Sequence, residues 1–295
     1  MEQGNNGYQF SKKVLIIFME NENLPTFSVL MSVYKKEKSE FLDESLKSIE
    51  SQTIMPNQIV LVEDGPLTLE LYKVIKRHKL MYDGLYDIVR GKQNQGLGSA
   101  LRLGTNKVKG EWIARMDSDD IAVPNRFELQ LREIIANPNL SLLGGQVDEF
   151  ETSIENVVGH RDVPLYEKKI RQFLKWRNPF NHPTVMIKKN ILQSVGGYDS
   201  QGKLEDYFLW VKIISNGNVF KNLPKILVHM RVDDGMYKRR GEIKNVKYIL
   251  KLRKLLYKSG LVNKCEEYIG SIIMIVNTIS PGWARKLLYK NTLHR

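Results

Sequence analysis

Residues 111–120 read EWIARMDSDD, an apolar segment that ends in a cluster of acids. The apolar part predicts a buried β-strand, and the acids stand where the chain leaves that strand. Carboxylates are the ligands that Mg²⁺ and Mn²⁺ prefer, and such an ion neutralises a diphosphate. We interpret Asp119 as a direct metal ligand and Asp117 as a metal or ribose contact. Alternatively, these acids cap a helix that begins near Asp120.

The segments before this stretch repeat one pattern, in which a short apolar strand is followed by a helix. Residues 27–34 (FSVLMSVY), 58–65 (QIVLVEDG) and 86–90 (YDIVR) are rich in β-forming residues. This alternation predicts an α/β, Rossmann-like fold with a mostly parallel central sheet flanked by helices. Ligands bind beyond the carboxyl ends of the strands in such sheets, and the acids fall at these ends.

Two turns at the same strand ends carry candidate donor-binding residues. Asp64, in VEDGP, offers a carboxylate to a nucleobase or a ribose hydroxyl, although Asp-Gly-Pro is also an ordinary turn sequence. Asn94 lies in QNQGLG, a turn that lets a ligand approach the backbone at a helix N-terminus. A purely structural turn explains QNQGLG equally well. Arg102, in the following helix, is a candidate phosphate or base contact.

A second acidic pair, Glu205-Asp206, heads an apolar segment that contains Trp210 and is predicted to be a helix. A carboxylate held beside aromatic walls has a pKa suited to deprotonating an acceptor hydroxyl. We therefore place a general base in this pair, and Glu205 and Trp210 on the acceptor side. The alternative is an acid favoured by the helix dipole. His182, in the loop NPFNHP, either lines the acceptor pocket or satisfies loop backbone groups.

Several cations and one histidine complete the candidate site. Arg115 precedes the acidic cluster, and Arg231, Lys238 and Arg239 flank the polar loop DDGMY. Cations beside such a loop can close over a departing diphosphate, so Arg231, Lys238 and Arg239 are predicted donor-binding residues. For these three, a solvated basic face is the alternative. Arg115 is a fourth predicted donor-binding residue. His229, which we place after a hydrophobic strand, is either a further metal ligand or structural.

The 295-residue chain carries a net charge of +12, and all the excess lies near its C-terminal end. Residues 221–295 hold 17 Lys and Arg against 5 Asp and Glu. Such a basic tail suits nucleic acid or an anionic membrane surface. The single cysteine, Cys265, fits a reducing cytosol, and we expect no transmembrane segment. We divide the chain into an extension (1–26), a catalytic domain (27–240) and a basic helical extension (241–295).

The segments FSVLMSVY, VEDG, QNQGLGSAL, MDSDD, GGYDS and EDYFLWVKI occur in this order. In this set the chain resembles family-2 inverting glycosyltransferases with the type-A fold, over about residues 27–240. PFNHPTV, EDYFLWVKI and GMYKRRG make it most similar to bacterial enzymes of O-antigen, amylovoran and other exopolysaccharide assembly. The family often has a Tyr-Arg-x-His-type pattern after the last strand, whereas this chain has Val-His-Met-Arg at 228–231, which puts the role of His229 in doubt.

The resemblance implies a nucleotide-sugar half at about 27–120 and an acceptor half at about 121–240. It further implies a base site at Asp64, a ribose and metal site at Asp117 and Asp119, and a catalytic base at Asp206. The implied reaction is a single displacement that turns an α-linked donor into a β-linkage, with Mn²⁺ or Mg²⁺ as cofactor. The implied donor is a UDP-sugar, for which we favour UDP-glucose or UDP-galactose.

The implied acceptor is a polyprenyl-diphosphate-linked sugar, which suits an enzyme that is cytoplasmic and peripheral on the inner face of the cell membrane. The apolar stripe near Ile269, Ile272, Ile273 and Val276 agrees with that position. Two other function classes remain. A sugar-phosphate nucleotidyltransferase normally has a glycine-rich signature after its first strand, and SVYKKEKSEF has no glycine. A non-catalytic nucleic-acid-binding protein explains the basic tail but not acids at strand ends, so we expect no nucleic-acid partner.

Overall fold

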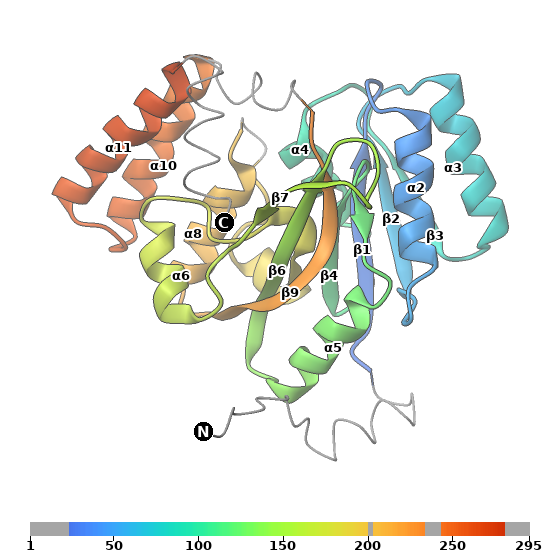
Figure 1. Cartoon of the computed structure of the whole chain (residues 1–295), viewed down its shortest axis with the longest axis horizontal. Coiled ribbons are helices and arrows are strands. Elements are labelled where there is room, and N and C mark those ends of the chain that lie inside the picture. The colour runs from blue at the N-terminus through green and yellow to red at the C-terminus, as the bar shows by residue number, and fades with distance from the viewer. Residues whose placement is uncertain (1–23, 200–202, 234–242, 281–295) are drawn as a thin grey trace.

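The computed structural model describes residues 24–199, 203–233 and 243–280, which form a central sheet with helices on both faces (Figure 1). The first half of the chain alternates strand and helix, as expected. Its four strands lie in the order β3-β2-β1-β4 and pair in parallel. Their bounds are Phe27–Val33 (β1), Gln58–Glu63 (β2), Tyr86–Arg90 (β3) and Trp112–Asp117 (β4).

The apolar runs of these strands reflect burial on both faces of the sheet. In β1, Val29 and Met31 belong to one core, and Leu30 belongs to the other. The first core includes side chains of three helices, which are α2 (Ser39–Glu50), α3 (Leu69–Met81) and α5 (Arg126–Ala136). The second includes side chains of four others, which are α4 (Leu97–Thr105), α6 (Glu167–Leu174), α8 (Glu205–Ser215) and α10 (Val246–Lys258).

The second half of the sheet mixes parallel and antiparallel pairs, so the sheet is parallel throughout only in its first half. β8 pairs antiparallel with both β4 and β6, β9 runs parallel to β6, and β5 and β7 pair antiparallel with β9 and β6. The bounds are Ile121–Ala122 (β5), Leu140–Phe150 (β6), Val157–Arg161 (β7), Met186–Lys188 (β8) and Val219–Arg231 (β9). The short helices are α7 (Lys189–Ser194) and the 3₁₀ turns His182–Thr184 and Ile243–Asn245.

The predicted C-terminal extension is helical where the structure describes it, in α10 and α11 (Lys264–Ile279), which lie side by side (Figure 1). Leu252 and Leu256 of α10 are fully buried in the core that α8 shares. This part of the extension is therefore packed onto the catalytic domain. Within the described ranges, no helix combines the length and apolar composition that a bilayer crossing needs.

Helix α2 is fixed to α3 by a buried ionic network. The His78 ring lies between two carboxylates, 2.8 Å from Glu50 and 2.7 Å from Asp43. Although burial disfavours the charged ring, these two carboxylates raise the pKa of His78. On its other side α2 contacts the acidic loop, because Ser45 Oγ donates to the carbonyl of Asp117 at 2.9 Å. The network thus anchors the helix on which the acidic loop rests.

Candidate active site

The acidic loop after β4 brings three carboxylates together. Ligand atoms of Asp117, Asp119 and Asp120 lie within 4.8 Å of one another. The alternative in which these acids cap a helix is wrong, because the chain continues into the strand β5, which pairs with β9. The loop is thereby fixed on both sides, by β4 before the acids and by β5 after them.

The electrostatics of this loop favour a bound cation. Burial, followed by the charges of Asp117 and Glu37, raises the pKa of Asp119 to about 7. Burial and the neighbouring acids also raise the pKa of Asp120. One Asp120 oxygen, Oδ1, accepts from the Arg231 amide at 2.9 Å, whereas Oδ2 is buried without a partner in the part of the chain described. Oxygen donors crowded in this way fit Mg²⁺ or Mn²⁺.

Arg115 is buried beneath the loop, with 2% of its surface exposed. Its guanidinium forms an ion pair with Asp117, and Nε and Nη1 have no hydrogen-bond partner within the described residues. A side chain so deeply buried orients Asp117, and we assign it that positioning role in place of the predicted direct contact with the donor. A buried, partly unpaired arginine costs stability, which is typical of a functional site.

The second acidic pair begins α8, directly after Leu204, whose φ of 71° is a rare left-handed conformation for a residue other than glycine. Asp206 accepts two hydrogen bonds, from the Tyr207 amide at 2.7 Å and from Asn178 Nδ2 at 2.5 Å. Burial raises the pKa of Asp206 despite these bonds, and burial together with Asp206 raises the pKa of Glu205 to about 7. Such carboxyl groups exchange protons near neutral pH.

Asp64 joins the turn after β2 to the turn after β3. Its carboxylate accepts from the Gln95 amide at 2.8 Å and the Gly96 amide at 3.0 Å, and Asn94 Nδ2 donates to the Asp64 carbonyl at 3.4 Å. The predicted residues Asp64 and Asn94 are therefore brought together. Their direct role here is to shape the loop that opens α4, and a base contact of Asp64 stays a prediction.

The start of α4 meets the acceptor half at Gly98. A Cβ atom on Gly98 would overlap the carbonyl oxygen of Asp199 and lie 3.2 Å from the Cβ of Glu205. A backbone carbonyl cannot swing aside as a side chain does, so only glycine fits this contact.

We expect Gly98→Ala to push the residues before α8 away from the donor half. The predicted loss is about 1–3 kcal/mol of unfolding free energy, as for other overpacked sites, together with reduced turnover. Urea unfolding and a kcat measurement check this prediction. Gly84→Ala is the control for turnover, because a Cβ there meets nothing within 4 Å; unlike Gly98, Gly84 has a positive φ, of 78°, so this substitution adds backbone strain without a close contact. Equal effects of the two substitutions on turnover would contradict the close-contact explanation.

Arg231, at the end of β9, braces the acidic loop. Its Nε donates to the Asp119 carbonyl at 3.1 Å, and its Nη2 lies 2.5 Å from Glu44. The guanidinium also stacks 3.8 Å from the ring centroid of Phe41 and 4.5 Å from that of Phe150. These contacts hold the side chain against the acidic loop, and the direct donor contact that we predicted for Arg231 stays a prediction.

We expect Arg231→Lys to weaken metal-dependent nucleotide binding by about 10–100-fold, the effect typical of residues that orient metal ligands. Lysine keeps the charge but loses the planar stacking and the fixed direction of Nε. Titration calorimetry of UDP with and without Mn²⁺ measures the effect. Arg132→Lys is the control, since Arg132 pairs with Glu128 on α5. If both variants bound like the native protein, Arg231 would not position the loop.

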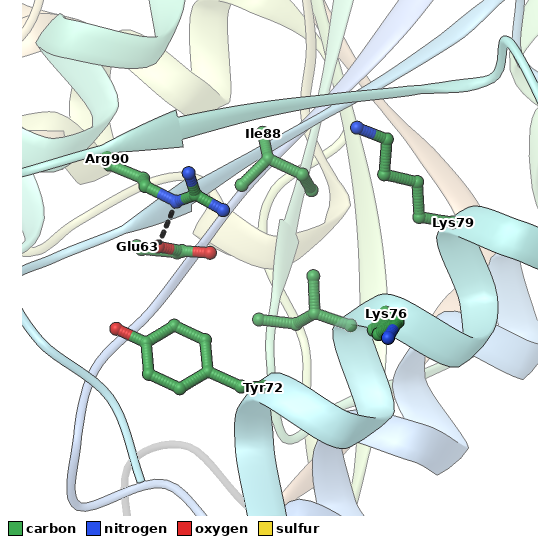
Figure 2. Close-up of a pocket in the computed structure, with 7 residues that line it drawn as sticks. Glu63, Tyr72, Lys76, Lys79, Ile88 and Arg90 are labelled. Atoms are coloured by element: carbon green, nitrogen blue, oxygen red, sulfur yellow. Dashed lines mark hydrogen bonds and ion pairs between the residues drawn. The ribbon is translucent and has the colours of Figure 1, made fainter. Parts of the chain in front are cut away.

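A cavity of about 260 Å³ opens near the ends of β2 and β3 (Figure 2). Ile75 and Ile88 are its apolar lining, and Arg90 Nε lies 3.1 Å from Glu63 at one side. The remaining lining residues come from α3 and are Tyr72, Lys76 and Lys79. The cavity is two strands away from the acidic loop along the same sheet edge, a separation of about 10 Å at the usual strand spacing.

Comparison with known proteins agrees with a site for nucleotide-sugar chemistry. Residues 28–196, more than half of the chain, match the family model described as Glycosyl transferase family 2. The chain belongs to glycosyl transferase family 2. It is therefore a glycosyltransferase.

Similar glycosyltransferases span almost the whole chain. An uncharacterized glycosyltransferase of Haemophilus influenzae is 37% identical over 91% of this chain and 99% of its own. The Escherichia coli UDP-Gal:alpha-D-GlcNAc-diphosphoundecaprenol beta-1,3-galactosyltransferase is 35% identical over 93% of this chain and 99% of its own. The Amylovoran biosynthesis glycosyltransferase AmsE of Erwinia amylovora is 36% identical over 90% and 98%.

Solved structures of other glycosyltransferases share the fold. S. aureus TarS 1-349 in complex with UDP gives a TM-score of 0.61 at 16% identity, over 91% of this chain and 75% of that one. The mannosyltransferase PcManGT from Pyrobaculum calidifontis, in complex with GDP-Man and Mn2+, gives 0.60 at 15% identity, over 92% and 80%. The fold of this glycosyltransferase is therefore the type-A fold predicted from the sequence.

Two predicted acceptor-side residues lie inside this glycosyltransferase. Trp210 is 0% exposed, and its ring packs 5.3 Å from Phe180 and 5.9 Å from His182. It therefore supports the site from the core and cannot touch an acceptor directly. His182 is buried, its Nε2 lies 3.1 Å from the Tyr198 hydroxyl, and burial lowers its pKa, so the ring is neutral.

The other predicted residues stand outside the carboxylate cluster or outside the described chain. His229 is inside β9, where we expected a position after the strand, and its Nδ1 is 3.9 Å from Asp148. The carboxylate cluster has Asp120 as its third member instead. Arg102 is exposed in the last turn of α4, at the opposite end from the turn that Asp64 holds. Lys238 and Arg239 lie outside the described residues.

Two residues that sequence analysis did not single out belong to the site. Glu37, in the loop after β1, accepts from Ser118 Oγ at 2.8 Å, and burial raises its pKa. Asn178 binds Asp206. Glu37 stands among lysines in YKKEK and carries no pattern of its own, whereas Asn178 sits in the quoted loop NPFNHP beside His182. Proximity to His182 was the one available signal for Asn178.

Proposed function

We propose that this glycosyltransferase is a metal-dependent inverting enzyme that moves a hexose from a UDP-sugar to a hydroxyl of a polyprenyl-diphosphate-linked saccharide. The observation that carries the proposal is the placement of two carboxylate groups around one buried arginine. The acidic loop stands on one side of Arg115, and Glu205-Asp206 stand close enough that the Arg115 charge opposes part of the rise that burial causes in the pKa of both. Donor activation and base catalysis therefore occur at adjoining positions.

Asp119 and Asp120 are the residues that would hold the cation, with Asp117 oriented by Arg115. The donor set consists of carboxylate oxygens, and the unpartnered Asp120 Oδ2 and the raised pKa of Asp119 support a site that receives positive charge. When bound, the cation neutralises charge that develops on the leaving diphosphate. We favour Mn²⁺ or Mg²⁺ and leave His229 out of this site.

Asp206 is the proposed base. Its carboxylate takes the proton of the acceptor hydroxyl while that oxygen forms a bond to the anomeric carbon. The bond from that carbon to the diphosphate oxygen breaks on the opposite face, and UDP leaves. Asn178 and the Tyr207 amide fix the Asp206 carboxylate in place. The single displacement inverts the anomeric centre and gives a β-linkage from an α-linked donor.

We place the nucleobase of the donor near the ends of β2 and β3. Asp64 has two oxygens, and a carboxylate accepts more bonds than the two that it receives from Gln95 and Gly96. The cavity beside Glu63 and Arg90 lies about 10 Å from the metal loop. A nucleoside diphosphate spans such a distance. We therefore assign the donor to residues 27–120, and the acceptor to residues 121–240, which contain Glu205 and Asp206.

The E. coli relative supplies the identity of the first substrates to test. Its name specifies UDP-Gal as donor and a GlcNAc-diphosphoundecaprenol acceptor, and the match covers nearly all of this chain. We therefore favour UDP-galactose over UDP-glucose. Because an acceptor of this kind resides in a membrane, we propose that the enzyme works in the cytoplasm at the inner membrane face. The product belongs to surface-polysaccharide assembly, as with AmsE.

A thermal-shift screen of nucleotide sugars, with and without Mn²⁺, tests the donor. A ligand that binds the native state adds about 2.7 kcal/mol of stability at about 100 times its Kd. We expect a rise in the unfolding midpoint for one UDP-sugar, and only when Mn²⁺ is present. Stabilisation by GDP-sugars, or by no nucleotide, would refute the proposed donor.

A further inference from the structure

The outward face of α11 is apolar along most of its length. Six side chains on it are between 46% and 70% exposed, and they are Tyr268, Ile269, Ile272, Ile273, Val276 and Ile279. At 3.6 residues per turn these positions fall on one side of the helix, and Gly270 and Thr278 face the protein. The apolar face therefore runs from Tyr268 to Ile279, about 18 Å at 1.5 Å per residue, and begins after the polar first turn of the helix.

The neighbouring helix α10 carries a row of lysines on its own exposed face. The spacing of Lys247, Lys251, Lys254 and Lys258 places all four on one side, and each is exposed. Leu250 and Tyr257 lie on the same side and are 49% and 45% exposed. The two helices lie side by side at the end of the molecule opposite α3 (Figure 1). Each helix therefore exposes a stripe of its own at this end of the molecule, apolar on α11 and cationic on α10.

This surface is preformed, because α11 is tied to the body of the protein. The Arg253 guanidinium donates to the carbonyls of Lys175 and Glu266 and lies against Gly270, where any Cβ would overlap it. A capping box between Asn263 and Glu266 fixes the start of α11. The orientation of the apolar face relative to the catalytic domain is thus set before any partner arrives.

We propose that the exposed faces of α10 and α11 dock onto an anionic lipid bilayer, with α11 lying in the membrane plane and its isoleucines inserted among the headgroups. Apolar side chains on one face and lysines beside them are what an interfacial helix presents to anionic lipid. The inference extends the proposed function by naming the surface that brings the enzyme to a lipid-linked acceptor.

The charge of the surface favours lipid over a second copy of the chain. A two-fold contact through α11 would bring two lysine rows of α10 toward each other, and like charges at an interface oppose association. Anionic headgroups instead neutralise the lysines, each of which contributes about 1 kcal/mol of attraction near such a surface.

The test is co-sedimentation of the full-length protein with vesicles that contain phosphatidylglycerol, compared with pure phosphatidylcholine vesicles, at low and high salt and without substrates. We expect binding to the anionic vesicles that weakens as salt rises. A polarity-sensitive dye on Cys265, the single cysteine and exposed near the start of α11, should shift to shorter wavelength on binding.

Two double variants assign the binding to its two stripes. Lys251→Glu/Lys254→Glu should weaken vesicle binding by about 30-fold or more, at about 1 kcal/mol per charge removed or reversed. Ile272→Glu/Val276→Glu should weaken it by about 100-fold, because each inserted aliphatic side chain contributes about 1.5 kcal/mol or more. The matched controls lie on or near α3 and α4 and are Lys73→Glu/Lys107→Glu and Leu69→Glu/Leu80→Glu, all at exposed positions.

Three outcomes would overturn the proposal: no binding to anionic vesicles at low salt, equal loss in variants and controls, or a dimer that Ile272→Glu/Val276→Glu converts to monomer while vesicle binding stays intact. Because sedimentation needs no substrate, failure here leaves the proposed transferase activity standing. Activity on a lipid-free acceptor tests that activity separately.

Discussion

Asp206→Asn is expected to lower kcat by about 10³-fold or more while the UDP-sugar still binds with near-native affinity. Asparagine has the shape of aspartate and keeps an oxygen for the Tyr207 amide, but it cannot take up the acceptor proton. General bases contribute about 10²–10⁴-fold to catalysis. Turnover and UDP-sugar affinity, measured on the same preparation, separate loss of chemistry from loss of binding.

The pH dependence of the native enzyme gives an independent reading of the same base. Burial raises the pKa of Asp206, and burial followed by Asp206 raises the pKa of Glu205 to about 7. Because the carboxylate of Asp206 is the active form, kcat should fall as the pH drops through the raised pKa of Asp206. The acid limb of the profile should therefore lie above the pH at which an ordinary carboxyl titrates.

The control variant is Asp83→Asn, in the turn after α3, which should leave kcat unchanged. If Glu205→Gln abolished transfer and Asp206→Asn did not, Glu205 would be the base. Near-native turnover in both variants would eliminate this pair from the chemistry. A kcat profile with no acid limb above the pH range of an ordinary carboxyl would contradict a base of this kind.

Asp119→Asn is expected to raise the unfolding midpoint of the metal-free protein and to lower it, relative to the native protein, when Mn²⁺ and UDP are bound. Without metal, Asp119 is a half-buried carboxylate beside Asp117 and Glu37, and its desolvation, followed by the repulsion from these two acids, raises its pKa to about 7. The pKa of Asp119 is higher in the folded protein than in the unfolded chain. Ionised Asp119 therefore lowers the free energy of unfolding at pH values above its unfolded-state pKa, and this loss grows up to about pH 7. Removing the charge should therefore raise the unfolding midpoint of the metal-free protein.

With Mn²⁺ and UDP present the order should reverse. The native protein gains stability from binding, whereas Asp119→Asn lacks a ligand and should bind UDP about 100-fold or more weakly, beyond the usual effect of residues that only orient ligands. Scanning calorimetry in the two conditions shows the crossover, and Asp83→Asn should show none. A metal-free protein destabilised by Asp119→Asn, or undiminished Mn²⁺-dependent binding, would exclude Asp119 as the ligand.

The local part of the fold was predictable from sequence because it depends on neighbours in the chain. Buried parallel strands such as β2 require unbroken apolar runs, and the six residues of β2 are all buried. β9 was harder, because exposed and buried residues mix along Val219–Arg231 and its pairing with β6 joins residues more than 70 positions apart. This long-range pairing also explains why His229 lies within a strand.

The same distinction applies to the site. Asp117 and Asp119 were found because acids directly follow an apolar strand. The contacts of Arg231 with the acidic loop were not predicted, because they depend on residues far apart in the sequence. Arg231 contacts Phe41 and Glu44 near the start of the chain and Phe150 in its middle. Trp210 was wrongly predicted to face the acceptor, because the sequence of an apolar helix does not tell which of its faces points into the core and which toward the site.

The measurement that tests the central claim most directly is transfer from UDP-galactose to a synthetic GlcNAc-diphospho-lipid in the presence of Mn²⁺, with the anomeric configuration of the product determined by NMR. The account predicts a β-linked disaccharide with the native enzyme, loss of product when the metal is chelated, and none with Asp206→Asn. An α-linked product, or equal product after chelation, would contradict it.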